Sequence, residues 1–153
     1  MADYVPAGYS SKLLLGLAQF LTAAGFGVYR EDSMYAPGER GIHINFTPAL
    51  ASTTPQESLS LQIYLPQRGV LATEHTSVQL RWQFVDRHPL YVNDTIDAVR
   101  ALFPERPEGG YQEIGGLKFD RIYQRSATTW GEEDRPGVLN ATQNLSFRGN
   151  RYE

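Results

Sequence analysis

Two runs in the segment 57–86 alternate apolar and polar residues, and this alternation constrains the fold more than any other feature of the sequence. The apolar positions of the first run are Leu59, Leu61, Ile63 and Leu65. Those of the second run are Val78, Leu80, Trp82 and Phe84. Successive side chains of a strand point to opposite faces, so each run predicts a strand with one buried face. Residues 66–75 are too many for a two-residue turn and too few for a helical crossover, so we expect a long antiparallel hairpin with an extended tip.

Two helices are predicted on either side of this hairpin. Residues 11–24 carry apolar side chains at helical spacing, and Ser10 or Ser11 can cap the first turn. Asp94 can cap a second helix, which Pro104 ends. The buried stripe of that second helix is Ile96, Val99, Leu102 and Phe103. Each helix has one apolar face that can cover the hairpin.

The remaining alternating runs predict further strands separated by loops. Strands are expected at 26–30, 42–46, 117–127 and 141–147, and loops at 31–41, 104–116 and 126–138. Irregular alternation near Asp120–Ile122 suggests a bulge. Short links between consecutive strands favour an antiparallel arrangement. We therefore expect an α+β fold, a two-layer domain with a mostly antiparallel sheet and two helices packed on one face.

Length and composition set the outer limits of the interpretation. A chain of 153 residues is expected to form one domain, 1–153, with a flexible arm at 1–9 and a tail at 149–153. Without cysteine the chain has no disulfide, no thiol nucleophile and no cysteine-ligated metal site. The net charge of -3 argues against a dedicated nucleic-acid-binding protein. The longest apolar segment, 13–27, is shorter than a membrane span needs, so we expect an intracellular protein without a membrane partner.

Motifs that would indicate an enzyme or a cofactor site do not emerge. His43, His75 and His88 fall at no metal-ligand spacing on one helix. The run Glu132-Glu133-Asp134 lacks the alternate spacing of calcium loops. The glycines of 109–116 precede a predicted strand, whereas a phosphate-binding loop precedes a helix, so they indicate a turn or a bulge. We therefore expect no catalytic residue, no cofactor and no metal.

Apolar residues on predicted loops point instead to contacts with other proteins. Met34 and Tyr35 lie in one such loop, Val70 and Leu71 at the hairpin tip, and Trp130 in a third. Apolar groups exposed on loop tips commonly mark contact surfaces. With Arg68 at the base of the tip, these residues are our candidates for a subunit or partner interface.

The order of elements resembles that of the tail-terminator proteins of long-tailed bacteriophages, which are also described as minor capsid or neck proteins. The resemblance covers about residues 11–148. It rests on four features in chain order: the helix Ser11–Gly25, the strand pair Leu59–Tyr64 and Ser77–Trp82, the helix Asp94–Phe103, and Gly115-Gly116 before a strand with the final strand Thr142–Phe147.

This resemblance implies a structural protein of the virion, located in the tail and neck and made in the host cytoplasm. It implies a hexameric ring that caps the tail tube, stops its polymerisation and joins the tail to the head. The implied partners are further copies of the chain, the tail tube protein and a head–tail connector or neck protein. DNA would only pass through the bore, and Glu74, Glu132 and Glu133 are candidates for acidic side chains that face it.

Two other interpretations remain open at this point. The chain could be a head-completion or stopper protein of the same neck, which would also form a ring. It could instead be a small ligand-binding α+β domain. That alternative predicts a pocket of convergent polar groups, for example one that gathers Asp86, His88 and Arg125.

Overall fold

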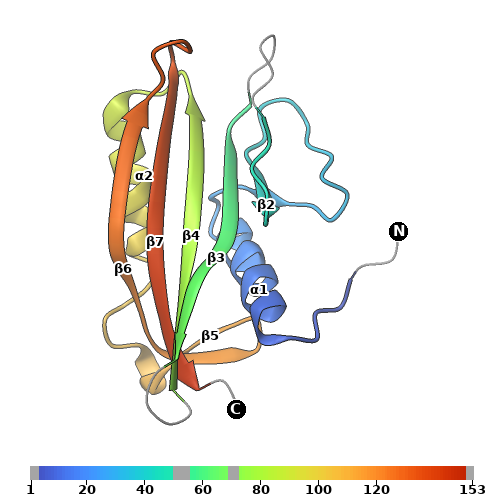
Figure 1. The fold of residues 1–153 in the computed structure, drawn as a ribbon, viewed down its shortest axis with the longest axis vertical. Helices are drawn as coiled ribbons and strands as arrows, with labels where there is room; N and C mark the ends of the chain where they lie inside the picture. Colours follow the sequence, from blue (N-terminus) through green and yellow to red (C-terminus); the bar gives the residue numbers. More distant parts are fainter. Residues whose placement is uncertain (1–3, 50–55, 69–72, 151–153) are drawn as a thin grey trace.

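Seven strands form one curled, mixed sheet, and two helices pack on it to make an α+β domain (Figure 1). The computed structural model describes residues 4–49, 56–68 and 73–150. The elements are α1 (Tyr9–Ala23), β1 (Val28–Tyr29), β2 (Gly41–Ile44), β3 (Ser58–Arg68), β4 (Thr73–Val85), α2 (Pro89–Arg100), the 3₁₀ turn η1 (Glu108–Gly110), β5 (Gln112–Ile114), β6 (Leu117–Gly131) and β7 (Val138–Asn150). The predicted fold class is confirmed.

The strand order across the sheet is β1-β2-β3-β4-β7-β6-β5. β1, β2 and β3 run parallel, and every other neighbouring pair is antiparallel. The expectation that consecutive strands are antiparallel was therefore wrong for the first three. Their connections, residues 30–40 and 45–57, are long enough to return the chain to the same end of the sheet, so neighbours can start from one side.

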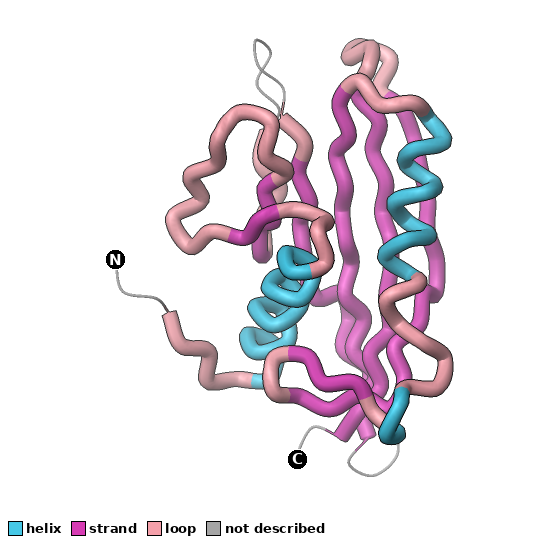
Figure 2. Tube along the Cα trace, turned by 180° about the vertical axis from the view of Figure 1, so that it is seen from behind, coloured by secondary structure: helices cyan, strands magenta, loops and turns pink. Residues whose placement is uncertain are grey.

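Both helices cover the same face of the sheet (Figure 2). α1 packs against β1, β2 and β3, and α2 packs against β6 and β7. Between them lies the core, in which side chains of the central strands β3 and β4 are completely buried. Trp82 and Phe84 stack there with ring centroids 5.6 Å apart. Burying one such side chain contributes about 1.5–3 kcal/mol.

The alternation that predicted the β3–β4 hairpin sorts its side chains as expected. Leu59 and Leu61 face the helices and are buried. The apolar residues of β4 face the same way and are buried too. The polar positions of both strands face the helix-free side, where Ser58 donates a hydrogen bond to Gln83 (3.0 Å). The opposite face of the sheet is therefore lined mainly by polar groups, Arg81 among them, and it carries no helix in the described part of the chain (Figure 1).

The hairpin of β6 and β7 is longer than predicted. Residues 128–131 and 138 were expected in a loop only but belong to these two strands, so only 132–137 connect them. Residues 125–131 are exposed on both faces, and an exposed strand shows no apolar alternation that could reveal it. A register shift between Phe119 and Arg121 confirms the expected bulge, and a second shift lies between Gln124 and Ser126.

The starts of both helices differ from the prediction. Gly8, rather than Ser10 or Ser11, occupies the N-cap position of α1. α2 begins at Pro89, earlier than the predicted cap at Asp94, and the His88 ring accepts the backbone N–H of Leu90. Pro89 fits the first turn of this helix because the N–H that a proline lacks has no helical partner there.

The turn between β5 and β6 packs directly against α1 and closes the curl of the sheet. Gly115 and Gly116 form this turn with φ values of +65° and +78°, which confirms a turn role for these glycines. A Cβ on Gly16 of α1 would meet the backbone of Gly115 and lie 3.1 Å from the carbonyl carbon of Ile114. Helix and turn thus touch backbone to backbone.

One buried polar side chain links three elements in the core. The Gln143 amide on β7 donates to the Ile96 carbonyl of α2 (3.0 Å) and to the Gln124 side chain of β6 (2.9 Å). Its oxygen accepts from the Trp82 indole of β4 (3.4 Å). Every polar atom of the side chain has a partner, so this glutamine can be completely buried without an unpaired group.

Candidate functional site

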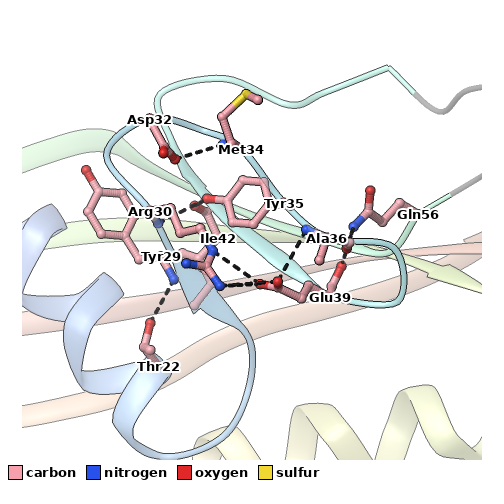
Figure 3. Close-up of polar contacts among 10 residues, drawn as sticks. All are labelled: Thr22, Tyr29, Arg30, Asp32, Met34, Tyr35, Ala36, Glu39, Ile42 and Gln56. Carbon is pink, nitrogen blue, oxygen red and sulfur yellow. Dashed lines mark hydrogen bonds and ion pairs between the residues drawn. The ribbon is translucent and has the colours of Figure 1, made fainter. Parts of the chain in front are cut away.

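The connection between β1 and β2, residues 30–40, is held in one conformation by its own polar contacts (Figure 3). Arg30 and Glu39 form an ion pair at 3.0 Å across the base of this 30–40 loop. The Gln56 amide, from beyond the loop, donates to the carbonyls of Ala36 (2.6 Å) and Glu39 (2.9 Å). A loop with this many internal bonds loses little conformational freedom when it binds a partner.

Met34 and Tyr35, which the sequence predicted as neighbouring contact residues, have opposite roles in this loop. Met34 is 72% exposed, and Figure 3 shows its side chain pointing away from the loop. Tyr35 turns inward: its hydroxyl donates to the Ile42 carbonyl (2.8 Å) and accepts the Arg30 N–H (3.2 Å). Burial raises the pKa of the Tyr35 hydroxyl. Tyr35 therefore supports the loop, and Met34 is the residue presented to the outside.

A hollow of about 410 Å³ lies beside the 30–40 loop on the helix-free face of the sheet. His43, Ser58 and Gln83 line it, together with Met34 and Tyr35. His43 is 7% exposed, and its Nδ1 has no hydrogen-bond partner in the described part of the chain. Burial lowers the pKa of this imidazole, so the ring is neutral at pH 7. No pattern in the sequence indicates this hollow, because its lining comes from three different strands and the loop.

His43 sits between two aromatic rings that hold it in place. The ring centroids of Tyr35 and Phe46 lie 5.1 and 4.9 Å from that of His43, both in edge-on contact. Gly41 packs below, where a Cβ would come within 2.8 Å of His43 Nε2. This packing is consistent with a structural histidine on the wall of the hollow.

A charged cluster around Glu57 ties the start of β3 to the start of α2. The Glu57 carboxylate accepts hydrogen bonds from Arg40 and Arg87 (3.0 Å each) and from the Val85 N–H (3.2 Å). Burial raises the pKa of the Glu57 carboxyl, but the hydrogen bond from Arg87 and the charge of Arg40 outweigh it, so the pKa is lowered. Arg40 also lies 5.3 Å from the ring centroid of Trp82. This cluster stabilises the fold.

The outer edge of β6 is open along most of its length. β5 pairs with β6 only from Leu117 to Phe119, and no other described strand pairs with that edge. From residue 126 to residue 131 the sequence Ser-Ala-Thr-Thr-Trp-Gly has no charge and no proline. Charged residues and prolines commonly protect the strand edges of monomeric proteins, because the unpaired N–H and C=O groups of an edge can bind another strand. The β6 edge is therefore a candidate contact surface, and the uncharged run 126–131 was its signal in the sequence.

The structure places the other predicted contact residues as follows. Trp130 lies on β6, not in a loop, and is 38% exposed, so it belongs to the open edge. Arg68 and Glu74 are opposite each other in the β3–β4 ladder. Val70 and Leu71 lie outside the described residues.

The two candidate bore residues of the β6–β7 loop differ in their surroundings. Glu132 accepts a hydrogen bond from the Asn140 amide (3.1 Å) and lies 3.7 Å from Arg135. Glu133 is exposed. Whether these residues and Glu74 line a bore stays a prediction.

The pocket that the ligand-binding interpretation predicted does not form around His88. His88 uses its Nδ1 to cap α2, and Asp86 lines a shallow surface with Glu57 and Arg87 instead of Arg125. In residues 4–49, 56–68 and 73–150, no cluster of three or more His, Asp or Glu side chains could hold a metal ion.

The two helices are too short or too polar to cross a lipid bilayer, so the described chain contains no candidate membrane helix. No model of a known protein family matches the sequence. No curated protein matches it either.

Proposed function

We propose that this chain is a structural virion protein of a long-tailed bacteriophage, which assembles into a hexameric ring, caps the tail tube, stops its polymerisation and joins the tail to the head. The order of helices and strands agrees with the features on which the resemblance rests: α1, the β3–β4 pair, α2, and the glycine turn that leads into β6 and β7. Its partners would be copies of itself, the tail tube protein and a neck protein.

The observation that carries this proposal is the open β6 edge. Residues 125–131 of β6 are exposed, and residues 126–131 carry no charge. Such an edge can pair with a strand of another chain. The surface at the other side of the sheet is different, since it consists of the short β1 and the 30–40 loop (Figure 1). When two different surfaces meet, association is head to tail, and such contacts close into rings when the rotation between copies allows it.

The proposal can be tested by adding charge to the open edge. Ala127→Lys and Thr129→Lys, both at exposed positions of β6, should leave the fold unchanged and block strand pairing, because a lysine on an edge disfavours a neighbouring strand. Ala98→Lys, on the exposed side of α2, is the matched control. We expect the control to form rings and the double β6 variant to remain monomeric in light scattering.

The role in the virion is tested separately, by removing the protein from the assembling phage. If it terminates the tail, tail tubes should grow beyond their normal length, and added protein should restore the length. Tails of normal length that fail to join heads would indicate a neck or stopper protein instead. Normal, fully assembled virions would contradict both roles.

A further inference from the structure

A basic cleft lies next to the open edge, between the end of α2 and β6. We call it the α2–β6 cleft; its volume is about 300 Å³, and Arg100, Arg121 and Glu105 line it above the apolar side chains of Phe103 and Leu145. Arg100 and Arg121 are both exposed. Two guanidinium groups and one carboxylate leave the cleft with a net positive charge.

Both arginines of the cleft have unused hydrogen-bond donors. Arg121 stacks on the Tyr123 ring, with 4.4 Å between the guanidinium carbon and the ring centroid. In the described part of the chain, neither Arg100 nor Arg121 forms an ion pair, which is also true of Arg81, Arg106 and Arg125, whereas Arg30, Arg40, Arg87, Arg135 and Arg148 all do. A cation in the last turn of a helix, such as Arg100, interacts favourably with the negative end of the helix dipole. That effect accounts for Arg100 but not for Arg121, which lies on a strand.

An acidic surface lies in the first part of the 30–40 loop, next to Arg30. Glu31 and Asp32 are exposed, and neither forms an ion pair in the described part of the chain. One oxygen of Asp32 accepts the N–H of Met34 (3.0 Å), which fixes the turn that presents the methionine (Figure 3). Two carboxylates and one exposed apolar side chain thus project from a rigid loop.

α2 and β6 lie near one edge of the sheet and the 30–40 loop lies at the other edge (Figure 1), so the loop of a chain is remote from its own α2–β6 cleft. We propose that Glu31, Asp32 and Met34 of one copy dock in the α2–β6 cleft of the next copy, where the carboxylates pair with Arg100 and Arg121. The apolar floor of the cleft then receives Met34. This inference rests on the ring assembly proposed above and names the two surfaces that meet.

The two surfaces of the proposed contact are opposite in charge. Bidentate pairing of a guanidinium with a carboxylate is among the strongest polar contacts of a protein surface. The ordered loop reduces the entropy lost on docking, because its conformation is already set by the contacts of Arg30, Tyr35 and Glu39. The contact is heterologous, so each copy uses its loop once and its cleft once, as a closed ring requires.

Charge reversal tests this contact, since every residue to be changed is exposed and the fold should tolerate the substitutions. The cleft variant is Arg100→Glu with Arg121→Glu, and the loop variant is Glu31→Arg with Asp32→Asn, which removes the Asp32 charge but keeps the oxygen that accepts the Met34 N–H. Each should raise the concentration at which half of the protein is assembled by about tenfold or more. The third variant carries all four substitutions and should assemble within about threefold of the unchanged protein. Light scattering over a concentration series gives these values, and circular dichroism verifies folding.

Mixing the two reversed variants tests the specific pairing of loop and cleft most directly. The cleft variant has an acidic loop and an acidic cleft, and the loop variant has a basic loop and a basic cleft. Alone, each should assemble only at the raised concentration, but an equimolar mixture should form rings near the concentration of the unchanged protein, with the two variants alternating, because each acidic cleft then meets a basic loop. Arg81→Glu and Asp94→Arg, at exposed positions elsewhere, are the controls and should assemble normally.

The outcomes separate this inference from the proposed function. If the unchanged protein assembles and both reversed variants assemble equally well, the loop–cleft contact is wrong while ring assembly stands. If the reversed variants fail alone and also fail when mixed or combined, the specific pairing is contradicted. If the unchanged protein stays monomeric in solution and on tail tubes, the proposed function itself fails.

Discussion

Replacing Gly16 with alanine should destabilise the protein, although helix propensity alone predicts the opposite sign. Alanine is favoured over glycine inside a helix by about 1 kcal/mol. In this helix, however, the new methyl group would collide with the backbone of Gly115 and approach the carbonyl carbon of Ile114 to 3.1 Å. Backbone atoms cannot rotate away as a flexible side chain can. α1 and the β5–β6 turn must therefore separate.

The size of the effect follows from these two opposing contributions. Overpacking a tight contact typically costs about 1–3 kcal/mol, and a contact between backbone atoms belongs at the upper end. Subtracting the propensity gain of about 1 kcal/mol leaves a net loss of about 2 kcal/mol in the free energy of unfolding.

Urea denaturation followed by circular dichroism measures this difference directly. Gln19→Ala, at an exposed position of the same helix, is the matched control and should stay within about 0.5 kcal/mol of the unchanged protein. A Gly16→Ala protein that is as stable as the unchanged one, or more stable, would refute the close contact between helix and turn.

Two further predictions concern ionisable groups in the fold. Glu57→Gln should lower the free energy of unfolding by about 3 kcal/mol at pH 7, because it leaves the partly buried Arg40 without its carboxylate. The folded-state pKa of Glu57 is lowered, so its contribution is complete above the unfolded pKa near 4.5 and is lost as the pH falls through the folded value. Urea unfolding of both proteins between pH 7 and pH 3 should therefore show the two stabilities converging in acid; a constant difference would contradict this. For His43→Phe we expect unchanged or higher stability at pH 7, since the buried, unpaired Nδ1 disappears. Burial lowers the folded-state pKa of His43, so the unchanged protein should lose stability as the pH falls below the unfolded pKa of about 6.5, and the variant should not. Parallel thermal melts of the two proteins at pH 7 and pH 5 would detect the difference. Equal losses of stability in both proteins would contradict it.

The central hairpin could be predicted because burial on one face leaves a period of two in the sequence. Leu59, Leu61 and Trp82 are each completely buried, and their polar neighbours face the other side. The same rule failed at residues 128–131 of β6, where both faces are exposed and no burial pattern constrains the side chains. The prediction placed the start of the second helix at Asp94 and missed Pro89, because proline favours a helix only in its first turn. Local patterns cannot reveal such context.

The contact surfaces were harder to predict than the core. Met34 was identified from an apolar residue in a polar loop, but the inward orientation of Tyr35 depends on a hydrogen bond to Ile42, which no spacing in the sequence indicates. The cleft of Arg100 and Arg121 brings together α2 and β6, which are separated in the chain by η1 and β5. Long-range juxtapositions of this kind follow from the topology and not from local sequence.

The most direct test of the central claim is the mass of the purified protein in solution, measured by light scattering across a concentration series, with negative-stain images of the same samples. We predict particles of about six times the 17.2 kDa chain mass, with a central hole. A protein that stays monomeric at every concentration, and that also fails to bind the ends of tail tubes, would contradict the proposal that this chain forms a ring and caps the tail.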